Sequence, residues 1–400
     1  MVNVVLGKRN HSEYGVVTVP FPIPREQYDQ IIEMLQALEI GDALNRDCWM
    51  EEISGDYPIL KRLEATEINV DEMDYLIKRL ESFDQYELLQ YQASAVSNGL
   101  SDMTDLINLT YCCQKVTVIQ DFRNLEQIGK RHVLTISGGC SIHEKLATYD
   151  FRKEALALIL NCDGKVTPYG VVYQNGMELD EVYKGRDFPA YQYDDFAVEV
   201  GVYDTGMTER SEDRTWLYFP MSKTGMERML ERSGFINPEK IRIASLSDSL
   251  LPHIEDYVDP SRESLDGING MAYAISELNT KEREKFKAAT EFVTPNGANQ
   301  LENLALQIDL FDFYPDITTP EEYGRHVIAE SRSFDSATGL DDFFDYKRFG
   351  EWKAQNEMGG FTANGYIVYC GVISIPELLA GVLSERLKEK EEILFGGIQL

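Results

Sequence analysis

Few residues in this 400-residue chain are spaced for catalysis. His132 and His326 occur in the similar stretches GKRHV and GRHV. No nucleophile lies near either of them in sequence, which favours structural packing. The stretch SGGCS places Cys140 on a glycine turn without a signalled base, so we interpret it as a loop. GINGMAYA lacks the lysine of a phosphate-binding loop. We therefore predict that the protein is not an enzyme and needs no cofactor.

The cysteines offer no metal site. None of the six belongs to a CxxC pair, and no histidine lies at metal-binding spacing. We predict buried, free thiols, with a zinc site or a disulfide framework as the alternative. The six residues are Cys48, Cys112, Cys113, Cys140, Cys162 and Cys370.

Membrane insertion and export are both disfavoured. No apolar run approaches the roughly 18–20 residues that a membrane span needs. The first residues, MVNVVLGKRNHSEYG, contain too short a hydrophobic stretch for a signal peptide. We expect a cytoplasmic protein.

Carboxylates are the reactive groups that the chain holds in excess. Its 68 acidic residues against 38 basic ones give a net charge of −30, which repels nucleic acid. The 22 tyrosines and 18 phenylalanines exclude a disordered acidic tail. With so many acids, a glycosidase-like carboxylate pair arises by chance and carries little weight. The composition indicates either an ordinary acidic surface or a strongly basic partner.

The acids concentrate in two segments. Residues 51–105 hold 13 acids against four bases, and residues 302–345 hold 11 acids against Arg325 and Arg332 alone. We predict that these segments form the partner-binding surface; the alternative for each acid is ordinary solvation or, for some, helix capping. The predicted residues are Asp309, Asp312, Asp316, Glu321, Glu322, Asp341, Asp342, Asp345, Asp71, Glu72, Asp74, Asp84, Asp102 and Asp105.

The chain repeats itself over about half its length. A shift of 198 residues pairs the motif MxYxIxxL at Met73 with the same motif at Met271, and it pairs two Phe-Pro and two Asn-Gly steps. After a slip of three residues, Gly129 pairs with Gly324 and Asp150 with Asp345. One offset over this length predicts an internal duplication.

Each predicted copy has three parts. A strand and helix, YGVVTVPFPIP and REQYDQIIEMLQAL, precede a helical middle part that starts at the cap Asn69, has one apolar face and breaks at Asn98-Gly99. The third part opens with a helix, which in copy two starts at Thr319-Pro320, and a final helix and strand close the copy. We predict an α+β fold, elongated, made of two tandem three-part units. The expected boundaries are 1–175 for copy one, 176–195 for a linker, 196–372 for copy two and 373–400 for a C-terminal helix. That helix either docks on its own chain or serves self-association.

Part of copy two resembles a known family. The segment LFDFYPDITTPEEYGRHVIAE, together with DDFFDYKRFGEWKAQNEMGGFTANGYIVY, resembles the ArdA antirestriction proteins, most specifically in FDYKRFG followed by GGFTANGY. Copy one resembles the pattern more loosely, with Glu154 and Ala155 where copy two has Phe349 and Gly350. The resemblance implies a three-part protein that mimics DNA, is carried on mobile genetic elements, and blocks type I restriction–modification enzymes. A typical member has one copy, usually in a dimer, whereas this chain has two.

Two functions therefore stand against each other. The first is a DNA mimic that occupies the basic DNA-binding groove of a type I restriction–modification enzyme and inhibits it stoichiometrically. The second is an acidic adaptor that binds another basic, defence-related protein complex. A carboxylate-dependent hydrolase is a weaker third reading. Neither of the first two needs direct nucleic-acid binding or a membrane, and both a homodimer and a covalent pseudo-dimer are open.

Overall fold

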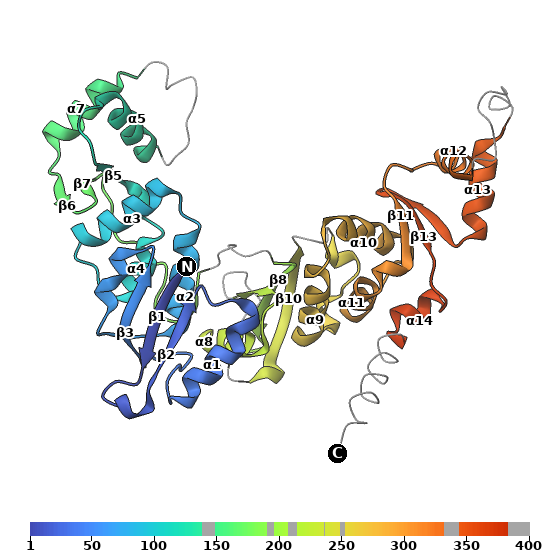
Figure 1. Cartoon of the computed structure of the whole chain (residues 1–400), viewed down its shortest axis with the longest axis horizontal. Coiled ribbons are helices and arrows are strands. Elements are labelled where there is room, and N and C mark those ends of the chain that lie inside the picture. Colours follow the sequence, from blue (N-terminus) through green and yellow to red (C-terminus); the bar gives the residue numbers. More distant parts are fainter. Residues whose placement is uncertain are drawn as a thin grey trace. The chain divides into compact units, whose positions relative to one another are not determined.

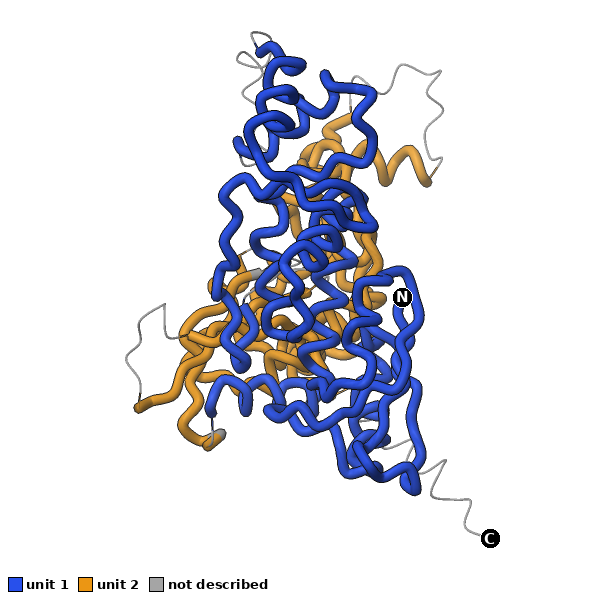
Figure 2. Tube along the Cα trace, turned by 90° about the vertical axis from the view of Figure 1, so that its left-hand side faces the viewer, with its two compact units in different colours: residues 1–193, 222–236 blue, residues 194–221, 237–400 orange. Residues whose placement is uncertain are grey.

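The computed structural model contains helices and short antiparallel strands, which confirms the predicted α+β class. Two compact units divide the chain: residues 1–193 with 222–236, and residues 194–221 with 237–400 (Figure 2). In the part of the chain that is described, no helix is long and apolar enough to cross a membrane. The described residues are 1–137, 149–189, 196–206, 214–235, 237–248, 253–331 and 344–382.

Unit 1 begins with an antiparallel sheet in the order β2-β1-β3-β4 (Figure 1). Alternate residues of β1 are buried, as expected of a strand with one face on the core. Helix α1 adds Ile31, Ile32 and Leu35 to the same core. The bounds are β1 Val2–Gly7, β2 Val16–Phe21, α1 Tyr28–Ala37, β3 Cys48–Gly55 and β4 Glu67–Ile68.

Three helices form the middle of unit 1: α2 (Val70–Glu81), α3 (Gln85–Ser97) and α4 (Met103–Leu109). The predicted cap is confirmed, because the Asn69 side chain accepts hydrogen bonds from the Asp71 and Glu72 amides at 3.0 and 3.1 Å. The predicted break after α3 is also confirmed, since that helix ends before Asn98 and Gly99.

The end module of unit 1 (residues 116–174) packs a helix pair on a small sheet. The helices are α5 (Leu125–Ile136) and α7 (Phe151–Asn161), which lie side by side (Figure 1). The antiparallel sheet has the order β5-β7-β6, and its small core includes Ile119, Ile128, Ala155, Leu158 and Tyr173. The strand bounds are β5 Val116–Ile119, β6 Lys165–Thr167 and β7 Gly170–Gln174.

The segment expected to be a linker packs into unit 1 as far as it is described, to residue 189. Tyr183 is 1% exposed. Its backbone amide donates to the Asn108 side chain at 2.7 Å, and Asn108 donates back to the Tyr183 carbonyl at 2.9 Å. Phe188 stacks on both Tyr75 and Tyr183. Unit 1 also includes α8 (Lys223–Arg232), although α8 follows a strand of unit 2 in the chain.

Unit 2 opens with a three-stranded antiparallel sheet in the order β10-β8-β9, followed by three helices (Figure 1). The last of these helices, α11, packs against α14, in which Leu378 and Leu379 are buried. The amide of Asn303 donates to the Leu379 carbonyl at 3.0 Å. The described C-terminal helix is therefore a short docked turn of helix, and residues 383–400 lie outside the described part. The bounds are β8 Val198–Asp204, β9 Thr215–Phe219, β10 Ile241–Asp248, α9 Leu265–Ser276, α10 Thr280–Val293, α11 Ala298–Leu306 and α14 Ile375–Leu379.

The end module of unit 2 (residues 308–371) has the same element order as that of unit 1. Its sheet runs β11-β13-β12, which matches β5-β7-β6, and α12 and α13 take the places of α5 and α7. Thr319 and Pro320 start α12, as predicted. The bounds are β11 Phe311–Tyr314, α12 Pro320–Ser331, α13 Tyr346–Asn356, β12 Gly359–Thr362 and β13 Gly365–Tyr369.

A glycine lets the two helices of each end module touch. A Cβ atom on Gly129 of α5 would lie 1.7 Å from the Phe151 carbonyl oxygen at the start of α7. On Gly324 of α12 it would lie 2.1 Å from the Tyr346 carbonyl oxygen at the start of α13. Neither contact can be relieved by a side-chain movement, because the obstructing atom belongs to the backbone. Both helix pairs therefore require glycine at this position.

We predict that Gly324→Ala destabilises the end module of unit 2 by about 1–3 kcal/mol, the usual cost of overpacking. Hydrogen exchange of the α12 and α13 amides measures this loss locally. Glu330→Ala, an exposed change on the same helix, is the control and should alter protection little. Unchanged protection in Gly324→Ala would show that the helices can separate at no cost.

Candidate partner-binding surface

Three of the predicted partner-binding acids are not on the surface. Asp71, Glu72 and Asp74, all on α2, are only 7%, 2% and 7% exposed. The prediction of a surface role is wrong for these three residues. Each has a cationic partner inside unit 1, because a carboxylate removed from water is stable only when it is paired or hydrogen-bonded.

Asp71 is held by α8. The Arg228 guanidinium donates to its carboxylate through Nη2 at 2.7 Å and Nε at 3.1 Å, while the Tyr28 hydroxyl donates at 2.5 Å. Arg228 also donates to the Gly41 and Asp42 carbonyls at 2.7 and 3.3 Å. Burial lowers the pKa of Arg228, but the Asp71 charge, Tyr28 and the hydrogen bonds to both together outweigh burial and leave the pKa above its ordinary value. The arginine is charged and fully engaged.

Glu72 accepts a second set of buried hydrogen bonds, next to that of Asp71. Arg46 donates to it at 2.8 and 3.2 Å, and the Tyr183 hydroxyl donates at 2.8 Å. Arg232, one turn after Arg228 on α8, hydrogen-bonds the same Tyr183 hydroxyl and donates to the Asn69 side chain at 3.1 Å. The cap of α2, the packed 177–189 segment and α8 thus share one hydrogen-bonded network.

Asp74 is bonded at the opposite edge of α2. The Ile23 amide donates to it at 2.6 Å, and Lys78 lies 3.2 Å away. Burial raises the pKa of Asp74, and Lys78 only partly opposes that effect. Asp74 therefore ties α2 to the segment after β2, and it offers nothing to a partner.

The remaining predicted acids of unit 1 lie at helix starts. Asp84 is exposed and caps α3, accepting from the Tyr86 and Glu87 amides at 2.7 and 2.8 Å. Asp102 is exposed, caps α4 and pairs with Arg46 at 2.7 Å. Asp105 is half-buried, and both burial and Asp102 raise its pKa. Of the six acids predicted in unit 1, four are paired with a cation of the same unit.

The predicted acids of unit 2 are placed differently, because every one that the structure describes is exposed. Asp309 and Asp316 make no side-chain hydrogen bond or ion pair with the described residues. Three others serve helix starts or surface pairs: Glu322 and Asp345 cap α12 and α13, and Glu321 pairs with Arg325 at 3.0 Å. Hydrogen bonds from the Thr318 backbone, first among several, lower the pKa of Glu322. Asp312 is exposed on β11 and accepts a weak hydrogen bond from Cys370 at 3.3 Å. Asp341 and Asp342 lie outside the described residues.

Sequence counts sharpen the contrast between the end modules. Residues 116–174 contain six acids and seven bases, whereas residues 308–371 contain twelve acids and five bases. The two modules share one topology but differ by eight unit charges. The candidate partner-binding surface is therefore the exposed acidic side chains of the unit 2 end module.

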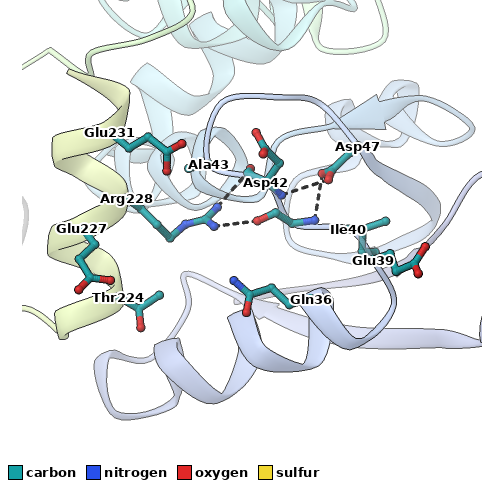
Figure 3. Close-up of a pocket in the computed structure, with 11 residues that line it drawn as sticks. Gln36, Glu39, Ile40, Asp42, Ala43, Asp47, Thr224, Glu227, Arg228 and Glu231 are labelled. Carbon is teal, nitrogen blue, oxygen red and sulfur yellow. Dashed lines mark hydrogen bonds between the residues drawn. The ribbon is translucent and has the colours of Figure 1, made fainter. Parts of the chain in front are cut away.

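A hollow of about 450 Å³ lies within unit 1, between α1, α8 and the loop before β3 (Figure 3). Several of its polar groups are already hydrogen-bonded or ion-paired. Arg228 reaches across to the Gly41 and Asp42 backbone, and Asp47 accepts from the amides of the same two residues at 3.0 and 3.1 Å. Glu39 pairs with Lys8. The acids that line the hollow are Glu39, Asp42, Asp47, Glu227 and Glu231.

The candidate catalytic groups have structural surroundings. His132 shares a hydrogen bond of 3.0 Å with the buried Thr117 hydroxyl, and burial lowers its pKa. His326 packs edge-on against Tyr314. Among the described residues, no group of three or more His, Cys, Asp or Glu side chains is placed to hold a metal ion.

The cysteine prediction holds only in part. The five described cysteines are free thiols, and Cys48, Cys112 and Cys113 are buried. Cys162 and Cys370 are exposed, so the prediction of burial is wrong for these two. Cys140 lies outside the described residues.

Sequence reasoning missed Arg228, Arg232 and Tyr183. The two arginines are spaced four residues apart, which does place them on one face of a helix. Nothing nearby in the sequence indicates that this face is buried, because Asp71 lies 157 residues away in the chain.

Comparison with known proteins assigns no family. No protein-family model matches the chain, and no curated protein sequence matches it significantly.

We predict that Arg228→Met destabilises unit 1 by about 3–5 kcal/mol, because it leaves the Asp71 carboxylate buried without its cation. Denaturant unfolding followed by hydrogen exchange in α2 measures the loss. Lys223→Met is the control on the same helix; its side chain is 76% exposed, so little change is expected. The double variant Asp71→Asn with Arg228→Met should recover part of the stability. A double variant no more stable than the single one would show that the charge pair is not the cause.

Proposed function

We propose that this protein is an antirestriction DNA mimic that occupies the DNA-binding groove of a type I restriction–modification enzyme. The observation that carries the proposal is the exposed carboxylate surface of the unit 2 end module. Residues 308–371 hold twelve acids against five bases, in a chain of net charge −30. Their carboxylates would present to a basic groove the same kind of negative charge as the phosphates of DNA.

The physical chemistry of such mimicry is simple. Duplex DNA carries one charge per about 1.7 Å, so thirty charges correspond to roughly 50 Å of duplex. Arginine forks that bind phosphate oxygens accept carboxylate oxygens with the same bidentate geometry, and lysines act as point charges. Inhibition of this kind is competitive and stoichiometric. It needs no catalysis and no cofactor.

We also infer that the chain is a tandem duplication of an ArdA-like unit. The matched strand orders of the end modules support this inference, as do the close approaches at Gly129 and Gly324. The first sheets agree as well, since β2-β1-β3 and β9-β8-β10 have the same order. The inferred copies are not identical in use, because the acids of α2 in copy one are paired with Arg228, Arg46 and Lys78.

An acidic adaptor for another basic, defence-related protein complex is the second candidate. One observation favours it: Trp352 on α13 is 57% exposed and stacks on Phe349 beside the exposed Glu351. Exposed aromatic anchors are typical of protein–protein interfaces and have no counterpart in a DNA backbone.

Titration of the protein into a type I methyltransferase bound to its DNA separates the two functions. A mimic displaces the DNA at stoichiometric ratios. An adaptor leaves the DNA in place, and persistence of the complex at excess protein would overturn the mimic.

We predict that the acids of the unit 2 end module act collectively. Single changes such as Asp316→Asn should weaken inhibition at most about fivefold, because an exposed ion pair contributes about 0–1 kcal/mol. The fourfold variant D309N/D312N/D316N/E321Q should weaken it more than about tenfold. A competition assay against DNA measures both.

The matched control neutralises four exposed acids of unit 1, as E26Q/E33Q/E51Q/E52Q. It changes net charge equally and should retain most of the inhibition. Equal loss in both fourfold variants would mean that total charge, and not this surface, determines binding. Abolition by one neutral substitution in a folded protein would contradict distributed mimicry.

We predict a steep salt dependence of the same inhibition. Because binding releases counterions, raising the salt from about 50 to about 200 mM should weaken binding at least about a hundredfold. The slope of the logarithmic plot should be shallower for the unit 2 fourfold variant. Salt-independent inhibition would indicate an apolar interface in place of a charged one.

A further inference from the structure

Each end module is followed by a segment that returns to the helix before the module. In unit 1 the chain leaves α4, passes through the end module and is bonded back to α4 through residues 177–189, here called strap 1. In unit 2 the chain leaves α11, passes through the end module and packs back on α11 through residues 372–381, called strap 2, which contain α14 (Figure 1). Each module is therefore attached to one helix through the chain on both of its sides.

An asparagine at the same place in both helices holds the strap. Asn108 is the sixth residue of α4, and Asn303 is the sixth residue of α11. Asn108 is 2% exposed; its side chain donates to the Tyr183 carbonyl at 2.9 Å and accepts from the Tyr183 amide at 2.7 Å. Asn303 is 7% exposed and donates to the Leu379 carbonyl at 3.0 Å. These bonds span 75 and 76 residues of chain, so the attachment recurs in position as well as in chemistry.

The strap explains why a buried amide stands in α11. Asparagine is a poor helix former, and a buried amide is stable only where it is hydrogen-bonded. Leu379 is the last residue of α14, so its carbonyl has no partner within that helix. The Asn303 amide supplies the missing donor and thereby holds the C-terminal end of α14 on α11.

The two straps differ in how they are held. Strap 1 has further polar attachments, because the Tyr183 hydroxyl donates to Glu72 at 2.8 Å and Asp180 pairs with Lys115 at 2.8 Å. Strap 2 is held by the two buried leucines of α14 and by the asparagine of α11. A helix of five residues is too short to be stable by itself, so α14 depends on its contact with α11. A single side chain can therefore decide whether strap 2 stays attached.

Strap 2 continues directly from the central strand of the acidic module. β13 lies between β11 and β12, and its sheet also contacts α10. There Lys285 donates to the Phe311 carbonyl at 3.0 Å, and the Ala363 amide donates to Glu291 at 3.0 Å. The module is thus attached to the rest of unit 2 through α10 on its sheet and through strap 2 at the C-terminal end of β13.

We propose that Asn303 is a positioning residue for the acidic surface of the unit 2 end module, because it fastens strap 2 to α11 and so limits movement of the module. The fastening is independent of the proposed function, whereas its effect on inhibition rests on that function. A surface that is held in one arrangement loses less conformational entropy on binding. Release of strap 2 should therefore weaken binding without changing any charge.

Hydrogen exchange of the full chain tests the fastening. In Asn303→Leu, the α14 amides should exchange at least about tenfold faster, because the strap loses a buried hydrogen bond. The α11 amides should keep their protection, since leucine forms helix better than asparagine. The matched control is Asn108→Leu, which should accelerate exchange of the Tyr183 amide and leave α14 unchanged. Unchanged α14 exchange in Asn303→Leu, or equal acceleration in both variants, would overturn the proposal.

Spin labels measure movement of the module. Glu277→Cys after α9 and Glu330→Cys on α12 replace exposed residues and carry the labels in a C140S/C162S/C370S background. The distribution of distances between the labels should be broader with Asn303→Leu and unchanged with Asn108→Leu. Faster α14 exchange with an unchanged distribution would show that strap 2 opens without moving the module, and the positioning role would be wrong.

A disulfide provides the rescue. A Cβ atom on Gly381 would lie 3.3 Å from the Asn303 Cγ atom, so cysteines at these two positions are close enough to be joined. The reduced variant N303C/G381C lacks the amide and should resemble Asn303→Leu. Oxidation of the same protein should restore slow exchange in α14. Fast exchange in the oxidised protein would contradict the fastening.

Inhibition of a type I enzyme tests the consequence. Asn303→Leu and the reduced N303C/G381C should inhibit about three- to tenfold more weakly at unchanged net charge, while Asn108→Leu and the oxidised protein should inhibit like the wild type. If the wild type does not inhibit, the proposed function fails, and the exchange and distance measurements still decide the fastening. If Asn303→Leu inhibits as well as the wild type although its module moves, the positioning role is overturned.

Discussion

The buried ion pair between Asp71 and Arg228 is the constraint on which unit 1 depends. It joins α2 to a helix that enters the unit from 157 residues further along the chain. A buried pair of this kind adds little stability relative to apolar packing, but losing one member is costly. Arg232 of the same helix hydrogen-bonds Tyr183 and Asn69, the cap of α2. The arrangement of helices in unit 1 therefore depends on this hydrogen-bonded network as well as on the apolar core.

This constraint also decides where negative charge is available. Each carboxylate that α2 turns inward is neutralised by an arginine or lysine of the same unit, and those cations are then unavailable elsewhere. The end module of unit 2 has fewer bases than the end module of unit 1. Two of its acids, Glu322 and Asp345, accept hydrogen bonds at helix starts, where the carboxylate stays in solvent. A capping carboxylate can stabilise its helix and still face a partner. Capping and partner binding are therefore compatible roles, whereas burial and partner binding are not.

Local patterns in the sequence predicted the local structure well. The apolar stripe of α2, its Asn69 cap and the Thr319–Pro320 start of α12 all depend on residues within a turn or two of one another. The same reasoning misplaced Asp71, Glu72 and Asp74, since their exposure depends on Arg228, Arg46 and Lys78 reaching them. Of those three, only Lys78 lies within one helical turn. The sequence also suggested a linker at residues 176–195. The part of it around Tyr183 packs into unit 1 instead, because Tyr183 exchanges two hydrogen bonds with Asn108, which is 75 residues away in the chain.

The two end modules show how one framework can carry two kinds of surface. Gly129 and Gly324 set the contact between the two helices of each module from the inside, where a Cβ atom would clash with backbone. The outer positions of α7 and α13 are free of that requirement, and there the side chains differ: leucines on one helix, glutamate and glutamine on the other. Because the inner contacts are unchanged, charge and hydrophobicity on the outer face can vary without disturbing the fold. A chain with two such modules can present a charged surface on one and an apolar surface on the other.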